Sequence, residues 1–279
     1  MKKSTIIIGV CAISLIGILY SLPKVVVDAK AKDNGLEGQT TEAIAAEEGP
    51  SAHATTSLTD DQLKTVNSIK EALSTDNKEQ KAITFLKLSD TFFKFQRFDS
   101  SAVYAEKAAE IFPSTENFLR AGDRYYEAFG FALNGGKAKH LGEKTREYYQ
   151  KALDQDPTLL LAKANMAMTY VSTDTPMQGI MMLREVLDTD PTNEVALFNM
   201  GILSMNSNQY SKAVERFSQI VKNNPNNTKA KFYLGVSLIE TGKKDEAKKV
   251  LAEVKKQEKD PAIQEAIKEL EQRLGKSND

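Results

Sequence analysis

The chain has 279 residues, of which 41% are hydrophobic and 27% are charged, so it can bury a core and is too polar for a multi-span membrane protein. Its 37 basic and 38 acidic residues give a net charge of −1, which argues against a nucleic-acid-binding protein that depends on a basic surface. One cysteine and two histidines exclude an intrachain disulfide framework and a Cys-based zinc site, and leave little for a histidine-rich metal centre.

The N-terminal segment has the pattern of a membrane anchor. Met1-Lys2-Lys3 is followed by an uncharged, largely apolar run from Ser4 to Pro23. As a helix, this run is about 30 Å long, close to the thickness of a bilayer's hydrocarbon core. We therefore predict a membrane anchor in residues 1–27, with a transmembrane helix over residues 4–23. The alternative is a signal segment that is cleaved near Ala29-Lys30-Ala31, which would release the protein into the periplasm.

The basic residues around this run bear on its orientation. Lys2 and Lys3 lie before it, and Lys24, Lys30 and Lys32 lie after it, so the positive-inside count is nearly even. The short basic head nevertheless resembles a bacterial export signal. We therefore expect a single-pass protein of the bacterial inner membrane with its larger part in the periplasm, and a cytoplasm-facing orientation is the alternative.

A polar linker separates the anchor from the first expected helix. Residues 28–57 contain no aromatic residue and are rich in Ala, Glu, Gly, Thr and Ser, which predicts a flexible, disordered linker. Thr59-Asp60-Asp61-Gln62 then has the form of a capping box at a helix start. Apolar residues follow at helical spacing as far as Leu73, so we predict a leading helix within residues 58–76.

Several columns of similar residues recur at intervals of 34 in the second half of the chain. The prolines are Pro157, Pro191 and Pro225, the small residues are Ala167, Gly201 and Gly235, and the large apolar residues are Leu183, Phe217 and Leu251. Glycine costs about 1 kcal/mol relative to alanine inside a helix, so its recurrence indicates close helix–helix approach. Proline ends the preceding helix because it lacks the backbone donor. Each unit is therefore predicted to be two antiparallel helices with a proline break.

A 34-residue helix–turn–helix unit of this kind resembles the tetratricopeptide repeat, and Met200-Gly201, Ala213 and Phe217 carry the resemblance most fully. It implies an all-α fold, a right-handed α-solenoid of stacked helix-turn-helix repeats. We expect five repeats in residues 77–261, at about 82–115, 116–159, 160–193, 194–227 and 228–261. The second contains about eleven additional residues around the turn Asn134-Gly135-Gly136, which we expect to lengthen both helices. Residues 262–279 are expected to form a C-terminal capping helix and tail.

No catalytic, cofactor-binding or metal-binding motif is present in the sequence, so we expect a protein that is not an enzyme. The resemblance implies that the first helix of each repeat lines a concave face that holds a partner segment. The partner-binding residues would then be Asn165, Met168, Phe198, Asn199, Ile202, Met205, Phe232, Tyr233 and Val236. Most are apolar, which suits an amphipathic helix or an apolar peptide. Alternatively, neighbouring helices cover part of these side chains.

The sequence therefore favours a membrane-tethered scaffold or adaptor that binds protein or peptide partners, and no nucleic acid, through the concave face of the repeats. One alternative is a periplasmic holdase-type chaperone in protein export or envelope assembly, which an apolar groove also suits. Another is an assembly platform that faces the cytoplasm.

Overall fold

The computed structural model describes residues 57–171 and 173–276, and every regular element within them is a helix. The anchor predicted for residues 1–27, and all but the last residue of the linker predicted for residues 28–57, lie outside the described residues. None of the helices from α2 to α13 is both long and apolar enough to cross a membrane. The transmembrane helix therefore stays a prediction from the sequence.

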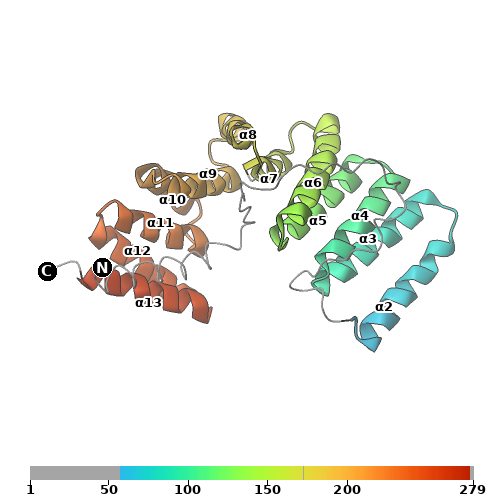
Figure 1. The fold of residues 1–279 in the computed structure, drawn as a ribbon, viewed down its shortest axis with the longest axis horizontal. Coiled ribbons are helices and arrows are strands. Elements are labelled where there is room, and N and C mark those ends of the chain that lie inside the picture. The colour runs from blue at the N-terminus through green and yellow to red at the C-terminus, as the bar shows by residue number, and fades with distance from the viewer. Residues whose placement is uncertain (1–56, 172, 277–279) are drawn as a thin grey trace, which may run out of the picture. The chain divides into compact units, whose positions relative to one another are not determined.

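The chain divides into two compact units between Pro176 and Met177. The N-terminal unit contains α2 (Asp60–Glu71), the 3-10 helix η1 (Ala72–Ser74), α3 (Lys78–Lys94), α4 (Phe98–Ile111), α5 (Thr115–Gly130), α6 (Gly135–Gln155) and α7 (Leu160–Val171). The C-terminal unit contains α8 (Pro176–Thr189), which starts at the boundary, α9 (Glu194–Asn206), α10 (Tyr210–Asn223), α11 (Thr228–Glu240), α12 (Lys244–Gln257) and α13 (Pro261–Lys276). Helices that follow one another pack as hairpins, α3 with α4, α5 with α6, α9 with α10 and α11 with α12 (Figure 1).

Small residues bring the two helices of a hairpin together, both at the column positions Gly201 and Gly235 and at the corresponding points of the two N-terminal hairpins. A Cβ added to Gly122, Gly201 or Gly235 would lie 2.5–2.6 Å from a side-chain atom of the partner helix. The first hairpin has serines instead, and the Ser89 and Ser101 hydroxyls each donate to the other residue's carbonyl oxygen at 2.8 Å. Close approach is therefore common to these hairpins, although the residues that permit it differ.

Three of the turns within hairpins share one backbone conformation. Gln96, Asn208 and Gly242 have φ values of 58°, 58° and 77°, in the left-handed region. The backbone N–H of the residue after each of them donates to the carbonyl five residues earlier in the chain, at 2.7–2.9 Å. This is the Schellman arrangement that ends a helix and satisfies its last carbonyls. Asparagine and glycine adopt this conformation readily, whereas glutamine does so at a cost.

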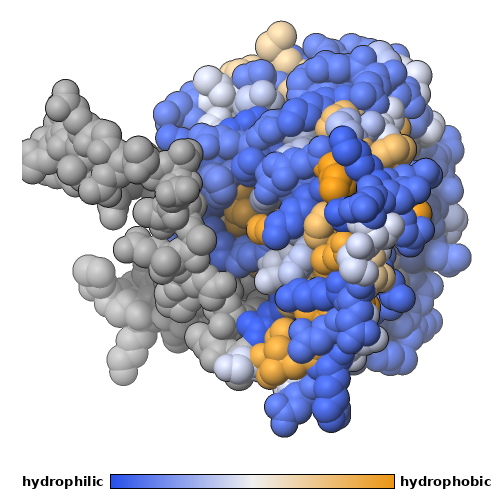
Figure 2. All heavy atoms as spheres, turned by 90° about the vertical axis from the view of Figure 1, so that its right-hand side faces the viewer, coloured by the Kyte–Doolittle hydropathy of each residue, from blue (hydrophilic) through white to orange (hydrophobic). Residues whose placement is uncertain are grey.

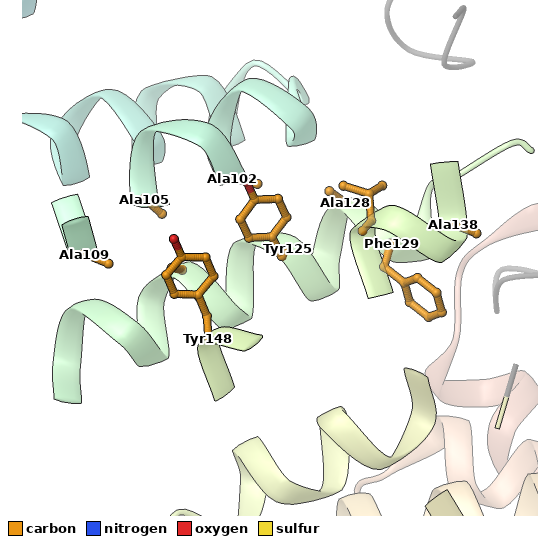
Figure 3. Close-up of a cluster of buried hydrophobic side chains, with 10 residues drawn as sticks. Ala102, Ala105, Ala109, Tyr125, Ala128, Phe129, Ala138 and Tyr148 are labelled. Atoms are coloured by element: carbon orange, nitrogen blue, oxygen red, sulfur yellow. The ribbon is translucent and has the colours of Figure 1, made fainter. Parts of the chain in front are cut away.

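The lengthened hairpin is formed by α5 and α6, which have 16 and 21 residues against 13 and 14 in α9 and α10. Both helices are longer than their counterparts α9 and α10, but α5 is no longer than α3, which has 17 residues. The hairpin packs against α4, where Ala102, Ala105 and Ala109 face the rings of Tyr125 and Tyr148 (Figure 3). Small side chains on α4 thus provide the room for large rings from α5 and α6.

The two ends of the described chain are closed by single helices. At the N-terminal end α2 begins with the predicted capping box, in which the Thr59 side chain accepts from the Gln62 N–H and the Gln62 side chain accepts from the Thr59 N–H. Val66 of α2 packs with Leu88 and Phe92 of α3. Figure 2 shows the face that carries α2, where apolar patches lie among mainly hydrophilic side chains.

At the other end, α13 has one buried stripe, formed by Ala266, Ile267, Leu270 and Leu274. They lie at the helical spacing of three and four residues that gives a helix one apolar face. The intervening polar residues face solvent, as expected for the last helix of a repeat array.

Candidate functional site

The first helices of the two C-terminal hairpins, α9 and α11, meet through a cluster of aromatic rings. Phe198 of α9 packs edge-on against Tyr233 of α11, with ring centroids 5.3 Å apart. Phe217 of α10 stacks on Tyr233 at 5.7 Å, and Phe232 packs edge-on against Tyr233 at 5.6 Å. Tyr233 thus joins three rings and fixes the positions of Phe198 and Phe232.

The residues expected to line this face differ in how far solvent reaches them. Asn199, Ile202, Met205 and Tyr233 are buried, with 7%, 2%, 7% and 8% of their surface exposed. Phe198, Phe232 and Val236 are half-buried. Solvent therefore reaches Phe198, Phe232 and Val236 more than it reaches the first group.

Lys229, which the sequence analysis did not single out, lies at the edge of this surface. Its Nζ is 4.7 Å from the centroid of the Phe198 ring. Partial desolvation lowers the pKa of Lys229, although the residue as a whole is exposed. Lys229 precedes Phe232 by three residues and so shares its helix face, which is the signal that could have identified it.

In the N-terminal unit the two expected site residues belong to α7. Met168 is buried, with 9% of its surface exposed, and Asn165 is half-buried. The Asn165 side-chain amide donates to the Tyr149 hydroxyl at 3.4 Å, and that hydroxyl donates to Asp123 at 2.7 Å. Burial raises the pKa of Asp123, although the bond from Tyr149 opposes the rise. Asn165 therefore takes part in a hydrogen-bonded chain within the unit.

The first helices of the N-terminal unit also carry charged side chains. Asp90 of α3 forms ion pairs with Arg124 and Arg120 of α5, at 2.6 Å and 3.7 Å. The Arg124 guanidinium also lies 4.1 Å from the centroid of the Phe93 ring. Ion pairs thus join α3 to α5, whereas α9 and α11 meet through the rings of Phe198 and Tyr233.

The most extensive polar network surrounds Glu106 of α4. Its carboxylate accepts hydrogen bonds from Tyr125 at 2.5 Å, Tyr148 at 2.9 Å and Lys144 at 2.7 Å. Burial of Glu106 favours the neutral acid, but the three donors outweigh this effect and lower its pKa. Burial, and next the hydrogen-bonded carboxylate of Glu106, raise the pKa values of Tyr125 and Tyr148. The perturbed groups are bonded to one another across α4, α5 and α6, so the network holds helices together.

The described part of the chain contains no group of three or more His, Cys, Asp and Glu side chains placed to hold a metal ion. On α9 and α11, partly exposed aromatic and aliphatic side chains lie together, and Lys229 lies beside the ring of Phe198.

Residues 205–270 match the family model of the tetratricopeptide repeat. A tetratricopeptide repeat protein from Parabacteroides merdae is similar in structure, with a TM-score of 0.58 at 13% identity over 78% of this chain and 80% of that one. Pseudomonas aeruginosa pilF gives a TM-score of 0.55 at 16% identity, covering 71% of this chain and 85% of that one. A thermophilic tetratricopeptide repeat protein of Thermus thermophilus gives a TM-score of 0.53 at 15% identity, covering 68% of this chain and 98% of that one. No curated protein sequence matches the chain.

At these identities the likeness concerns the fold alone. The all-helical hairpins of the described residues are of the tetratricopeptide repeat type, as the sequence predicts.

Proposed function

We propose that this protein is a non-catalytic scaffold or adaptor that binds an amphipathic helix or apolar peptide of a partner protein. The observation that carries the proposal is the set of half-buried apolar side chains on α9 and α11, namely Phe198, Phe232 and Val236. The rings of Phe198 and Phe232 pack against the buried Tyr233, which limits their movement and favours a surface that is preorganised for contact. Proteins of this fold commonly act as interaction scaffolds, which supports the same reading.

The chemistry of the surface favours one mode of recognition. Aromatic side chains offer large contact areas at a small cost in side-chain entropy, and they dominate the energetics of many interfaces. An amphipathic helix places apolar residues at intervals of three and four, which suits two parallel first helices that each offer a ring. We therefore propose that the partner segment packs its apolar stripe on Phe198 and Phe232.

The proposal includes attachment to a membrane through residues 4–23, with the repeats on the periplasmic side of a bacterial inner membrane. The uncharged run and the basic head of the sequence support this part. A phosphatase that is active only outside the cytoplasm, fused after Asp279, tests the orientation. An active fusion is expected, and an inactive but intact fusion would favour the cytoplasm-facing platform.

A photo-crosslinking residue at position 232 in intact cells tests the binding surface. We expect it to capture one or two defined partners, and the same residue at position 248, on the exposed side of α12, to capture none of them. The double variant F198E/F232E should lose the partners while its helical circular dichroism is retained. Capture that persists in this variant would overturn the surface. Binding of many unrelated unfolded proteins would favour the holdase-type chaperone instead.

A further inference from the structure

One end of the N-terminal unit contains the start of a helix and two turns. The start of α2, the α3–α4 turn and the α5–α6 turn lie at the same end because successive helices are antiparallel. Leu58, just before α2, packs against the same apolar cluster as Phe95 in the α3–α4 turn. Phe98, after that turn, stacks on Phe131 in the α5–α6 turn with ring centroids 4.2 Å apart. We call this end the tether edge, because residues 1–56 join the described chain here.

The tether edge carries exposed apolar side chains. Leu133 is 60% exposed, the highest value among the large hydrophobic residues of the described chain, and Phe131 is 42% exposed. The stack on Phe98 holds Phe131 in place, and an ion pair of 2.5 Å between Lys137 and Asp99 holds the start of α6 against α4. The turn is therefore a fixed apolar projection, with Leu133 at its tip.

Basic residues surround this projection. Residues 128–142 contain no acidic residue, and neither do residues 91–98 of the α3–α4 turn. Lys139 and His140 of α6 and Lys94 of α3 are exposed. Asp99 is paired with Lys137. The other acids of this edge are Asp60 and Asp61 in the first turn of α2 and the exposed Glu127 in the last turn of α5. The positive charge is therefore local to the start of α6 and the end of α3, where the exposed basic side chains are Lys139, His140 and Lys94.

We propose that the tether edge docks on the surface of a bilayer that contains anionic lipids, with Leu133 and Phe131 in the interfacial region. Exposed apolar side chains next to lysines are the combination by which peripheral proteins contact membranes, because the chains enter the interface and the ammonium groups meet the headgroups. The proposal deepens the membrane attachment proposed above and rests on it.

Because the tether edge is joined to the membrane anchor proposed above, even a weak contact between this edge and the bilayer can be populated. The linker predicted for residues 28–57 would have a root-mean-square reach of about 30 Å, so the edge stays close to the bilayer that holds residues 4–23. Under this constraint, docking is an intramolecular step with a high effective concentration. Two apolar side chains and a few lysines are then sufficient to orient the unit.

The chain has no tryptophan, so the variant Leu133→Trp introduces a single fluorescent probe at the tip. The full chain is reconstituted with vesicles of phosphatidylcholine and phosphatidylglycerol whose acyl chains are brominated. We expect the emission of this probe to shift to the blue and to be quenched at least about twofold relative to unbrominated vesicles, as for a tryptophan at the membrane interface. The matched control is Met181→Trp on α8, where Met181 is 56% exposed, and this probe should not be quenched.

Flotation of the vesicles separates the possible outcomes. Attachment of the protein without quenching at position 133, or with equal quenching at positions 133 and 181, overturns the docking of the tether edge and leaves the membrane attachment standing. Absence of attachment overturns both. Adding Lys94→Glu and Lys139→Glu to Leu133→Trp should reduce the quenching on vesicles with phosphatidylglycerol, and unchanged quenching would overturn the role of the anionic lipid. Circular dichroism confirms that each variant is folded.

Discussion

Gly201 of α9 lies directly against the ring of Phe217 of α10, so closely that a Cβ on Gly201 would come 2.6 Å from the Phe217 Cζ atom. Phe217 is fully buried and also contacts Phe198 and Tyr233. The ring therefore cannot move aside without disturbing the surface proposed to bind partners. Alanine is usually more favourable than glycine inside a helix, but at position 201 the Phe217 ring leaves no room for a Cβ.

The first prediction concerns this contact. Gly201→Ala should destabilise the C-terminal unit by about 1–2 kcal/mol, because overpacking outweighs the gain in helix propensity. Urea denaturation followed by circular dichroism measures the change. Gly136 in the first turn of α6 is the matched control, since an added Cβ meets only an Asn134 oxygen at 3.7 Å. Gly136→Ala should leave stability unchanged or raise it, and equal losses for both variants would contradict the account.

The second prediction uses the carboxylate of Glu106. Its pKa lies below the ordinary value, so its ionised form stabilises the folded state above the unfolded pKa, and this contribution is lost as the pH falls through the folded pKa. Glu106→Gln should therefore cost about 2 kcal/mol at pH 7. The difference from the wild type should shrink below about pH 4.5.

Urea denaturation at a series of pH values tests this dependence. Glu110 lies on the same helix and is exposed, so Glu110→Gln is the control and should change stability little. A cost for Glu106→Gln that stays constant down to pH 3 would show that its hydrogen bonds do not depend on its charge.

A third prediction separates the two apolar residues of the α5–α6 turn. Phe131→Ala removes the stack on Phe98 and should cost about 1–2 kcal/mol. Leu133→Ala should change stability by less than about 0.5 kcal/mol, because the side chain is 60% exposed. Thermal denaturation of both variants provides the measurement. A larger loss for Leu133→Ala would mean that the tip is part of the core and is not presented for contact.

The fourth prediction concerns Lys231 of α11, which is 5% exposed and pairs with Glu253 of α12 at 2.6 Å. Glu253→Gln leaves the buried cation without its counter-charge and should cost about 1–2 kcal/mol. Lys231→Met replaces the cation with an apolar chain of similar length and should cost less. Chemical denaturation of the two variants ranks them, and the reverse order would indicate that the lysine, once unpaired, reaches solvent freely.

The hairpins and their phase could be predicted because the contact between a small and a large residue is repeated along the chain. The glycine and the large residue that it contacts lie 16 residues apart in both hairpins, as Gly201 with Phe217 and Gly235 with Leu251. The same contact therefore appears in the sequence as a repeated pair of residue types. The capping box at Thr59 is equally local, since both of its partners lie within four residues. Such features need no knowledge of the tertiary structure.

The networks between hairpins could not be predicted in this way. Glu106 meets Lys144 and Tyr148, which are 38 and 42 residues away, so no local pattern in the sequence connects them. The exposed fraction of each side chain on α9 could not be predicted from the sequence either. Ile202 and Phe198 are four residues apart on one face, yet Ile202 is 2% exposed while Phe198 is half-buried. The spacing of apolar residues identifies one face of a helix, but the exposure of each side chain on that face depends on the helices packed against it.

Selection of ligands for the purified protein from a random peptide library would show whether α9 and α11 present a peptide-binding surface. We expect that peptides with apolar residues at helical spacing are enriched, that they bind saturably, and that F198E/F232E abolishes their binding while Lys248→Glu on α12 does not. Selected peptides that bind F198E/F232E as tightly as the wild type would contradict this expectation.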